Sequence, residues 1–325
     1  MKTPSPTPRP FRVPARIHRA VDRCDWWRIL LCGCLLLCHS LPAAAKTAVD
    51  QLQRTVAVPD HPMRIVAMAP SITEILFALD LSPRLVGVTR FSDYPPAAQS
   101  LPKVGSYVHL DVEKIISLEP DLCIAVKDGN PLSVVRKLET VGIPVYAVDP
   151  RDLKAVMATL SELGRLLDVA SRAEAIVADM ADRIRRVQTR VADADHRPSV
   201  FFQIGISPIV SVGTKTFIHE LIVMAGGRNL ARGPTPYPRF SKEQVIGLRP
   251  EVMIITSMAR EAVFDQVEAE WRRWPELPAV KNGCIYLVDS NVFDRASPRL
   301  VDGLEMLARL IHPECFPAGE YGRQP

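Results

Sequence analysis

From residue 64 to residue 148 the chain alternates short apolar runs with stretches whose apolar residues recur at helical spacing. Short apolar runs are typical of buried strands, and a 3.6-residue period is typical of helices. This alternation predicts a mostly parallel sheet that is covered by helices on both faces. Ser71 and Glu74 are expected to form a capping box at the start of the first helix. The expected strands cover residues 64–69, 86–88, 121–126 and 144–148, and the expected helices cover residues 71–79 and 132–141.

Residues 151–196 show almost no strand signal, and their apolar positions follow a helical period. The pattern breaks between Asp168 and Ser171, and Ser171 is expected to cap a second helix that runs to about Asp193. A helix of that length spans on the order of 30 Å. We therefore expect a stiff helical connector that limits hinge motion between the parts of the chain on either side.

The rest of the chain returns to the alternating pattern. It predicts a second α/β lobe over residues 197–325, beside a first lobe over residues 46–150. Two lobes of similar build suggest a cleft between them. The strands expected in the second lobe cover residues 200–204, 208–212, 251–256 and 285–289, and the helices cover residues 216–225 and 299–311.

One segment occurs twice, at residues 112–124 and 242–254, with a constant offset of 130 residues. Each copy has the pattern of a short helix that ends before a proline and leads into a strand. Asp111 and Ser241 precede the copies as N-cap residues, and Ser241 is expected to form a capping box with Gln244. Each copy also places one glutamate in the first turn of its helix: Glu113 and Glu243.

The first 45 residues differ from the rest in charge and in apolar pattern. They hold seven Lys or Arg against two acidic residues, followed by the apolar run Ile29–Cys38 and the end Ala43–Ala45. A basic region, a short apolar core and an Ala-x-Ala end are typical of a secretory signal peptide. The run is shorter than the roughly 20 apolar residues of a transmembrane helix. We predict that residues 1–45 are a signal peptide that is cleaved after Ala45.

Removal of this segment changes what the charge implies. The chain has 40 Lys and Arg against 36 Asp and Glu, and 33 basic and 34 acidic residues remain after residue 45. The mature chain is nearly neutral, which gives no reason to expect a nucleic acid as a partner. Three widely spaced cysteines predict no disulfide framework and no Cys-x-x-Cys site: Cys123, Cys284 and Cys315.

The sequence lacks the motifs of several enzyme classes. It has no Gly-x-x-x-x-Gly-Lys-Ser/Thr phosphate loop and no Gly-x-Ser-x-Gly elbow. After residue 45, no two histidines lie at the spacing of a metal site. We therefore expect no catalytic residue, no resident cofactor and no bound metal ion. The alternative of another class is an α/β metallo-enzyme or chelatase, with Asp294 beside Arg295 as its acid–base pair.

Six short motifs carry a family resemblance: Ala69–Leu76, Phe91–Pro96, Leu118–Leu122, Phe202–Ile206, Gly226–Leu230 and Phe293–Arg299. Together they resemble the periplasmic substrate-binding proteins of ABC importers, in the class that takes up cobalamin, haem and ferric siderophores. The last motif is most similar to the cobalamin receptors. The resemblance implies a class III fold, in which two Rossmann-like α/β lobes with mostly parallel sheets are joined by a long α-helix. It also implies a periplasmic location.

The resemblance implies a partner as well. In this family two glutamates, one on each lobe, dock into arginine pockets of the membrane permease, and Glu113 and Glu243 match these positions. Two exposed carboxylates suit a two-fold symmetric partner, because each can form charge-assisted hydrogen bonds with arginine. The implied partner is an ABC permease dimer with its ATPase, and the receptor is expected to be a monomer that performs no chemistry.

The ligand cleft implied by the resemblance is lined by aromatic and polar residues of both lobes. A corrinoid is large and flat, so aromatic faces with a few polar anchors suit it. Tyr107 and Tyr237 stand where cobalamin receptors carry tryptophan, and Asn291-Val292 replaces an Asp-Trp pair. The residues expected to bind the ligand are Phe91, Tyr107, Tyr237, Asn291, Val292, Phe293, Asp294 and Arg295.

Two other ligands of the same class stay open. A haem receptor would coordinate iron through a Tyr or a His, for which the candidates are Tyr107, His109 and Tyr237. A ferric-siderophore receptor would use arginines, for which the candidates are Arg90, Arg239 and Arg295. The main interpretation is a receptor for a cobalamin-like corrinoid, and these are its alternatives.

Overall fold

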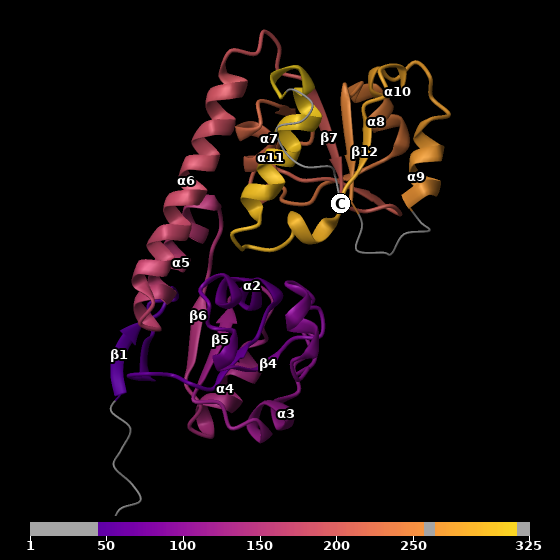
Figure 1. Ribbon diagram of the computed structural model, residues 1–325. Coiled ribbons are helices and arrows are strands. Elements are labelled where there is room, and N and C mark those ends of the chain that lie inside the picture. The colour runs from indigo at the N-terminus through magenta and orange to yellow at the C-terminus, as the bar shows by residue number, and fades with distance from the viewer. Residues whose placement is uncertain (1–44, 257–263, 317–325) are drawn as a thin grey trace, which may run out of the picture. The chain divides into compact units, whose positions relative to one another are not determined.

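Two separate parallel sheets organise the chain (Figure 1). The computed structural model describes residues 45–256 and 264–316, which belong to one compact unit, Ala45–Pro325. The predicted signal peptide lies outside the described residues except for Ala45, which begins a strand. None of the described helices has the length and apolar character that a membrane crossing requires.

The N-terminal lobe is built on the sheet β4-β3-β5-β6, whose strands are all parallel. Helix α2 packs against β3 and β5, and α4 packs against β6. An antiparallel hairpin, which the sequence pattern did not reveal, precedes the sheet. The elements are β1 (Ala45–Val49), β2 (Thr55–Pro59), β3 (Ile65–Ala67), α2 (Pro70–Ala78), η1 (Ser82–Arg84), β4 (Leu85–Val88), η2 (Pro96–Ser100), α3 (Val112–Ser117), β5 (Leu122–Val126), α4 (Leu132–Thr140) and β6 (Val145–Val148).

The C-terminal lobe is built on the sheet β12-β11-β7-β9, again all parallel. A short antiparallel pair, β8 with β10, stands beside it. The elements are β7 (Ser199–Gln203), β8 (Ile209–Val210), α7 (Phe217–Met224), β9 (Arg228–Asn229), β10 (Arg239–Phe240), α8 (Lys242–Leu248), β11 (Val252–Ile255), α9 (Phe264–Trp271), α10 (Pro278–Lys281), β12 (Ile285–Leu287), η4 (Ser290–Val292), α11 (Leu300–Ile311) and η5 (Pro313–Cys315).

Two helices connect the lobes, as the helical period predicted. Helix α5 (Leu153–Leu166) packs against α6 (Ala170–Ala192), and α6 also packs against α11 of the C-terminal lobe (Figure 1). At 1.5 Å per residue α6 is about 34 Å long. The predicted cap is wrong: the N-cap is Val169, with no side-chain hydrogen bond, and Asp168 makes the turn at φ 62°.

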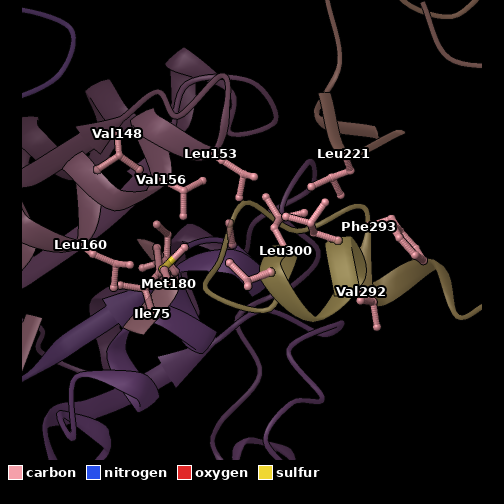
Figure 2. Packing of buried hydrophobic residues seen from close by; sticks show 14 of the residues in the cluster. Ile75, Val148, Leu153, Val156, Leu160, Met180, Leu221, Val292, Phe293 and Leu300 are labelled. Atoms are coloured by element: carbon pink, nitrogen blue, oxygen red, sulfur yellow. The ribbon is translucent and has the colours of Figure 1, made fainter. Parts of the chain in front are cut away.

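One apolar core extends from the first sheet through the connecting helices to the second sheet. Figure 2 shows part of it, with Val148 of β6, Met180 of α6 and Leu221 of α7 among its labelled members. Each sheet has its other face in a core of its own. Because both lobes share one packed interior, they cannot separate without exposing apolar surface to water.

The repeated segment forms the same helix–strand unit in both lobes, namely α3 with β5 and α8 with β11. Asp111 accepts a hydrogen bond from the backbone of Lys114, and Ser241 forms the predicted capping box with Gln244. Each helix is followed by a residue in the left-handed region, Glu119 at φ 46° and Arg249 at φ 49°. The offset of 130 residues therefore reflects a real structural repeat.

The repeat extends to the direction of the strand side chains. Leu122 and Ile124 lie in the shared core, and so do the equivalent Val252 and Ile254. Cys123, by contrast, lies in the separate core of the N-terminal lobe, and its equivalent Met253 lies in that of the C-terminal lobe. Alternate residues of a strand face opposite sides of the sheet, so the period of two in these apolar runs sets which core each residue fills.

The capping box predicted for the first helix is wrong. Helix α2 begins at Pro70, and its N-cap Ala69 has no side-chain hydrogen bond. Proline suits the first turn of a helix because its missing N–H would have no partner there. Glu74 lies in the middle of α2 instead, and its carboxylate pairs with arginines of the other lobe.

Candidate functional site

A cleft of about 1110 Å³ lies between the two lobes. It is lined by residues that follow β3, β5 and β6 of one sheet and β12 of the other. Ligands of open parallel sheets bind at the carboxyl ends of the strands. The topology of both lobes therefore makes this cleft the expected binding site. The volume lies slightly above the usual range of small-molecule pockets, which extends to about 1,000 Å³, and thus suits a large ligand.

Three of the predicted aromatic residues line the cleft, namely Phe91, Tyr107 and Tyr237. Phe91 and Tyr237 are 50% and 59% exposed, which is unusual for residues with large apolar rings and leaves aromatic surface accessible to a ligand. Tyr107 is half-buried and lies against Gly129, where an added Cβ would stand 2.6 Å from its ring. Gly129 also has φ 133°, so glycine at this position allows the ring to lie where it does.

Val292 and Phe293 do not line the cleft, contrary to the prediction. Phe293 is 1% exposed and meets Phe202 edge to face at a ring distance of 5.4 Å. Val292 is also buried, and Figure 2 shows both residues among the buried side chains. The physical reason is the turn η4, which directs Asn291, Asp294 and Arg295 to the cleft and these two residues into the core.

Arg295 lies in the floor of the cleft, but its guanidinium is fully engaged by protein. It pairs with Glu74 at 2.8 Å and with Asp93 at 2.7 Å, and it donates to the carbonyl oxygen of Phe91 and to Asn291 Oδ1. Burial alone would lower the pKa of Arg295, but the bonds to Asp93 and Glu74 outweigh it and raise the pKa. Its prediction as a direct ligand anchor therefore has little support from this geometry.

Asp294 lines the cleft, and its carboxylate accepts no hydrogen bond from the described residues. Its side chain remains accessible to solvent from the cleft, while surrounding protein raises its pKa to about 6. Arg295 opposes this rise and Asp289 adds to it. Asp294 is therefore an acceptor that changes its charge just below neutral pH.

The remaining charges of the cleft divide by lobe. On the N-terminal side Arg151 pairs with Asp128 at 2.5 Å and with Asp149 at 2.6 Å. On the C-terminal side Asp289 and Lys215 form no ion pair within residues 45–256 and 264–316. Asp289 Oδ1 accepts a hydrogen bond from the backbone N–H of Asn291, so the other oxygen of Asp289 and the ammonium of Lys215 are the charged atoms that this side offers to a ligand.

The cleft contains residues that the sequence did not single out, including Phe217, Lys215 and Asp289. Phe217 is the first residue of α7, directly after its N-cap Thr216. The sequence could have revealed Phe217, because a capped helix that follows a strand starts near the carboxyl edge of the sheet.

Partial burial raises the pKa of Tyr237, and the charges of Asp294 and Asp128 and the phenol of Tyr107 add to the rise.

Only part of each alternative set lies in the cleft: Tyr107 and Tyr237 of the iron candidates, and Arg295 of the siderophore candidates. His109, Arg90 and Arg239 are exposed and are not among the residues that line the cleft. Of the described residues, one group has donor atoms within 4.8 Å that suit a metal ion, namely His312, Glu314 and Cys315. This group lies outside the cleft, and His312 Nδ1 is already 2.8 Å from the Glu314 carboxylate.

Glu113 and Glu243 are both exposed, on α3 and α8 respectively, and neither lines the cleft. Hydrogen bonding to Ser241 and to its own backbone N–H lowers the pKa of Glu243, so this carboxylate stays ionised. The two glutamates occupy the same place in the structural repeat, one on each lobe. They are thus available to a partner that contacts both lobes.

Comparison with known proteins adds three relatives. Residues 65–292 match a family described as periplasmic binding protein. The chain is 32% identical over 243 residues to a vitamin B12-binding protein of Vibrio parahaemolyticus, covering 74% of this chain and 86% of that protein. It is 30% identical over 276 residues to an ABC transporter substrate-binding lipoprotein of Bacillus subtilis, covering 83% and 86%. A periplasmic haem-binding protein from Pseudomonas aeruginosa shares 30% identity and a TM-score of 0.70, covering 78% and 93%.

Proposed function

The chain belongs to the periplasmic binding protein family, and we propose that it captures a cobalamin-like corrinoid in the periplasm and delivers it to an ABC permease. The observation that carries the proposal is the cleft of about 1110 Å³, which combines open aromatic rings with unpaired carboxylates. The protein binds and releases its ligand without a catalytic step. The names of a vitamin B12-binding protein and of an ABC transporter substrate-binding lipoprotein among the relatives support this proposal.

The apolar part of the cleft suits a broad flat ligand. Phe91 stands on the N-terminal lobe and Tyr237 on the C-terminal lobe, and both rings are about half exposed. A corrin ring placed between them buries apolar surface on both of its faces, and each aromatic contact contributes roughly 0.5–1.5 kcal/mol beyond burial. Tyr107 and Phe217 extend the apolar lining on the two sides.

The polar part of the cleft favours a corrinoid over haem. The edge of a corrinoid carries carboxamide groups, whose N–H groups donate to carboxylates such as those of Asp294 and Asp289. The edge of haem carries two propionates, which these carboxylates would repel. Two cations on the same wall could attract a propionate. Lys215 is available for this contact, whereas the guanidinium of Arg295 is already paired with Glu74 and Asp93.

Haem is the second candidate, because Tyr107 and Tyr237 both line the cleft and tyrosine can bind haem iron. Iron coordination requires the phenolate form. Burial and acidic neighbours raise the pKa of Tyr237, which opposes that form. The charge of the cleft and the raised pKa of its phenol therefore both favour a corrinoid over haem.

Calorimetric titration of purified residues 45–325 tests the proposal. Residue 45 is retained because Ala45 pairs with Pro59 in the hairpin. The titrants are cyanocobalamin, dicyanocobinamide, haemin and a ferric siderophore. We expect one-to-one binding of a corrinoid that is at least about tenfold tighter than binding of the other two ligand types. Binding of haemin or of the siderophore alone would overturn the corrinoid assignment.

We propose that Glu113 and Glu243 dock the loaded receptor onto the permease dimer with its ATPase. Both are exposed on equivalent helices, and carboxylates at such positions can form charge-assisted bonds with arginine. We also propose that residues 1–45 direct export, that the mature chain acts as a monomer, and that its parts are residues 46–150, 151–196 and 197–325. In the variant with both Glu113→Ala and Glu243→Ala, corrinoid affinity should stay unchanged while uptake is lost. Unchanged uptake would contradict the docking role.

A further inference from the structure

A buried carboxylate of one lobe holds three residues of the other. Glu74 of α2 is 4% exposed and is not among the residues that line the cleft. Its Oε1 pairs with Arg295 Nη1 at 2.8 Å and with Arg299 Nη1 at 3.3 Å, and its Oε2 accepts a hydrogen bond from Ser297 Oγ at 2.5 Å. All three partners belong to the segment between η4 and α11 of the C-terminal lobe. A carboxylate with this many charge-assisted bonds strongly fixes its partners.

The same segment has further contacts with the N-terminal lobe. Arg295 also pairs with Asp93, and the guanidinium of Arg299 lies 3.8 Å from the ring centre of Tyr94. We call Glu74, Asp93 and Tyr94 on one side, with Arg295, Ser297 and Arg299 on the other, the inter-lobe clasp. Because these bonds join the lobes at the floor of the cleft, a change of the angle between the lobes has to pivot here or break them.

The clasp reaches the ligand residues through Arg295. Its guanidinium donates to the carbonyl oxygen of Phe91 at 3.0 Å and to Asn291 Oδ1 at 2.6 Å. Phe91 and Asn291 line opposite walls of the cleft, and Asp294 is the direct neighbour of Arg295 in the chain. The position of this one guanidinium therefore fixes residues on both walls.

Glu74 also neutralises Arg295. If Glu74 lost its charge, Asp93 would remain, but its side chain is 48% exposed and its attraction is weakened by solvent. The positive charges of Arg295 and Arg299 would then be only partly compensated at the floor of the cleft. An uncompensated cation there attracts an anionic ligand.

Resting on the function proposed above, we propose that Glu74 is a positioning residue that sets both the affinity and the ligand class of the cleft without touching the ligand. It keeps the guanidinium of Arg295 bonded to protein groups, orders Phe91 and Asn291 through it, and compensates its charge at the floor of the cleft. The cleft is thereby kept suited to a ligand rich in neutral amides instead of one with carboxylates.

The test compares Glu74→Gln with a matched control, Glu305→Gln. Glu305 is also a buried carboxylate with two arginine partners, Arg183 at 2.9 Å and Arg309 at 3.6 Å, but it joins α6 to α11 and does not line the cleft. Both changes remove a buried charge, so both should lower the melting temperature. A purely structural role for Glu74 predicts that the two variants bind ligands alike.

We expect Glu74→Gln to weaken dicyanocobinamide binding about tenfold or more and to raise the affinity for haemin relative to cobinamide by a similar factor, on the scale of one hydrogen bond to a charged group. Glu305→Gln should change neither. Ser297→Ala removes a single bond to Glu74 and should produce a smaller shift in the same direction, which keeps the test available if Glu74→Gln does not fold. Equal ligand selectivity in the Glu74 and Glu305 variants would overturn the proposal.

A ligand-free readout separates this proposal from the proposed function. Spin labels at positions 137 and 281, one on each lobe, report the distance between the lobes after Cys284 and Cys315 are replaced by serine. We expect a broader distance distribution in Glu74→Gln than in Glu305→Gln. If the wild type binds no corrinoid, the proposed function fails while this comparison still decides on the clasp. An identical distribution in both variants would contradict the role of the clasp.

Discussion

The two walls of the cleft use their charges differently. On the N-terminal wall, Arg151 forms ion pairs with both Asp128 and Asp149, so each of these charges already has a partner of opposite sign. On the C-terminal wall, Asp289 and Asp294 form no ion pair within residues 45–256 and 264–316. A charge that is already paired gains little from a ligand, whereas an unpaired carboxylate in a cleft gains a donor. We therefore expect the C-terminal wall to select the ligand by its polar chemistry.

The aromatic residues, in contrast, are divided between the walls. Phe91 and Tyr107 come from the N-terminal lobe, and Tyr237 and Phe217 come from the C-terminal lobe. Stacking on a flat ligand needs a ring on each face, so both walls are expected to contribute to affinity. Substitutions on one wall or the other can therefore separate the polar contribution from the aromatic one.

The largest effect is expected from Asp294→Asn. The change removes an ionised acceptor from the C-terminal wall and keeps the size of the side chain. Loss of a hydrogen bond to a charged group should weaken corrinoid binding by roughly ten- to a hundredfold. Titration calorimetry at about pH 7.5 measures the loss, and an affinity within about twofold of the wild type would remove Asp294 from the binding site.

The pH dependence should follow the same residue. The pKa of Asp294 is raised from 3.8 to about 6, so the folded chain holds this proton more tightly than the unfolded chain. The contribution of Asp294 to the free energy of unfolding should therefore fall as the pH rises from about 4 to about 6. Corrinoid affinity should change in the opposite sense and strengthen as the carboxylate ionises. Asp294→Asn should remove both dependences, and an unchanged pH profile in the variant would contradict this assignment.

The aromatic contacts should be similar in strength on the two walls. Phe91→Ala and Tyr237→Ala should each weaken corrinoid binding by about three- to tenfold, because each removes one stacking face. Tyr237→Phe is the control, since it keeps the ring and loses only the hydroxyl. If one of the two alanine variants had no effect, the ligand would not lie between these rings.

The smallest effect is expected from Arg151→Gln on the N-terminal wall. Arg151 is half exposed and paired with two carboxylates, and such pairs contribute little to either stability or binding. The change should alter corrinoid affinity by at most about threefold. A loss as large as that of Asp294→Asn would show that the N-terminal wall also selects the ligand by charge.

Much of the fold could be predicted because the local rules agree with the tertiary structure. The caps at Asp111 and Ser241 and the apolar runs of β5 and β11 act over a few residues, so their sequence patterns are sufficient. The hairpin of β1 and β2 was not visible, because it is a short, partly exposed pair with no turn motif of its own.

The site was predictable in part for the same reason. Phe91, Tyr107 and Tyr237 line the cleft. Phe293 is buried, because the turn η4 that precedes it directs its side chain into the core. Glu74 looked like a capping residue, since three positions from Ser71 is the spacing of a capping box. Its real partners are more than 200 positions away in the sequence, and no local pattern can reveal such a pair.

The most direct test of the account compares two corrinoids that share the same ring and differ chiefly in the charge of their edge. One is dicyanocobinamide, with carboxamides, and the other is the dicyano form of the fully hydrolysed corrinoid acid, with carboxylates. If the unpaired carboxylates of the C-terminal wall select the ligand, the acid should bind residues 45–325 at least about tenfold more weakly at pH 7.5. Equal or tighter binding of the acid would show that these carboxylates do not select the ligand.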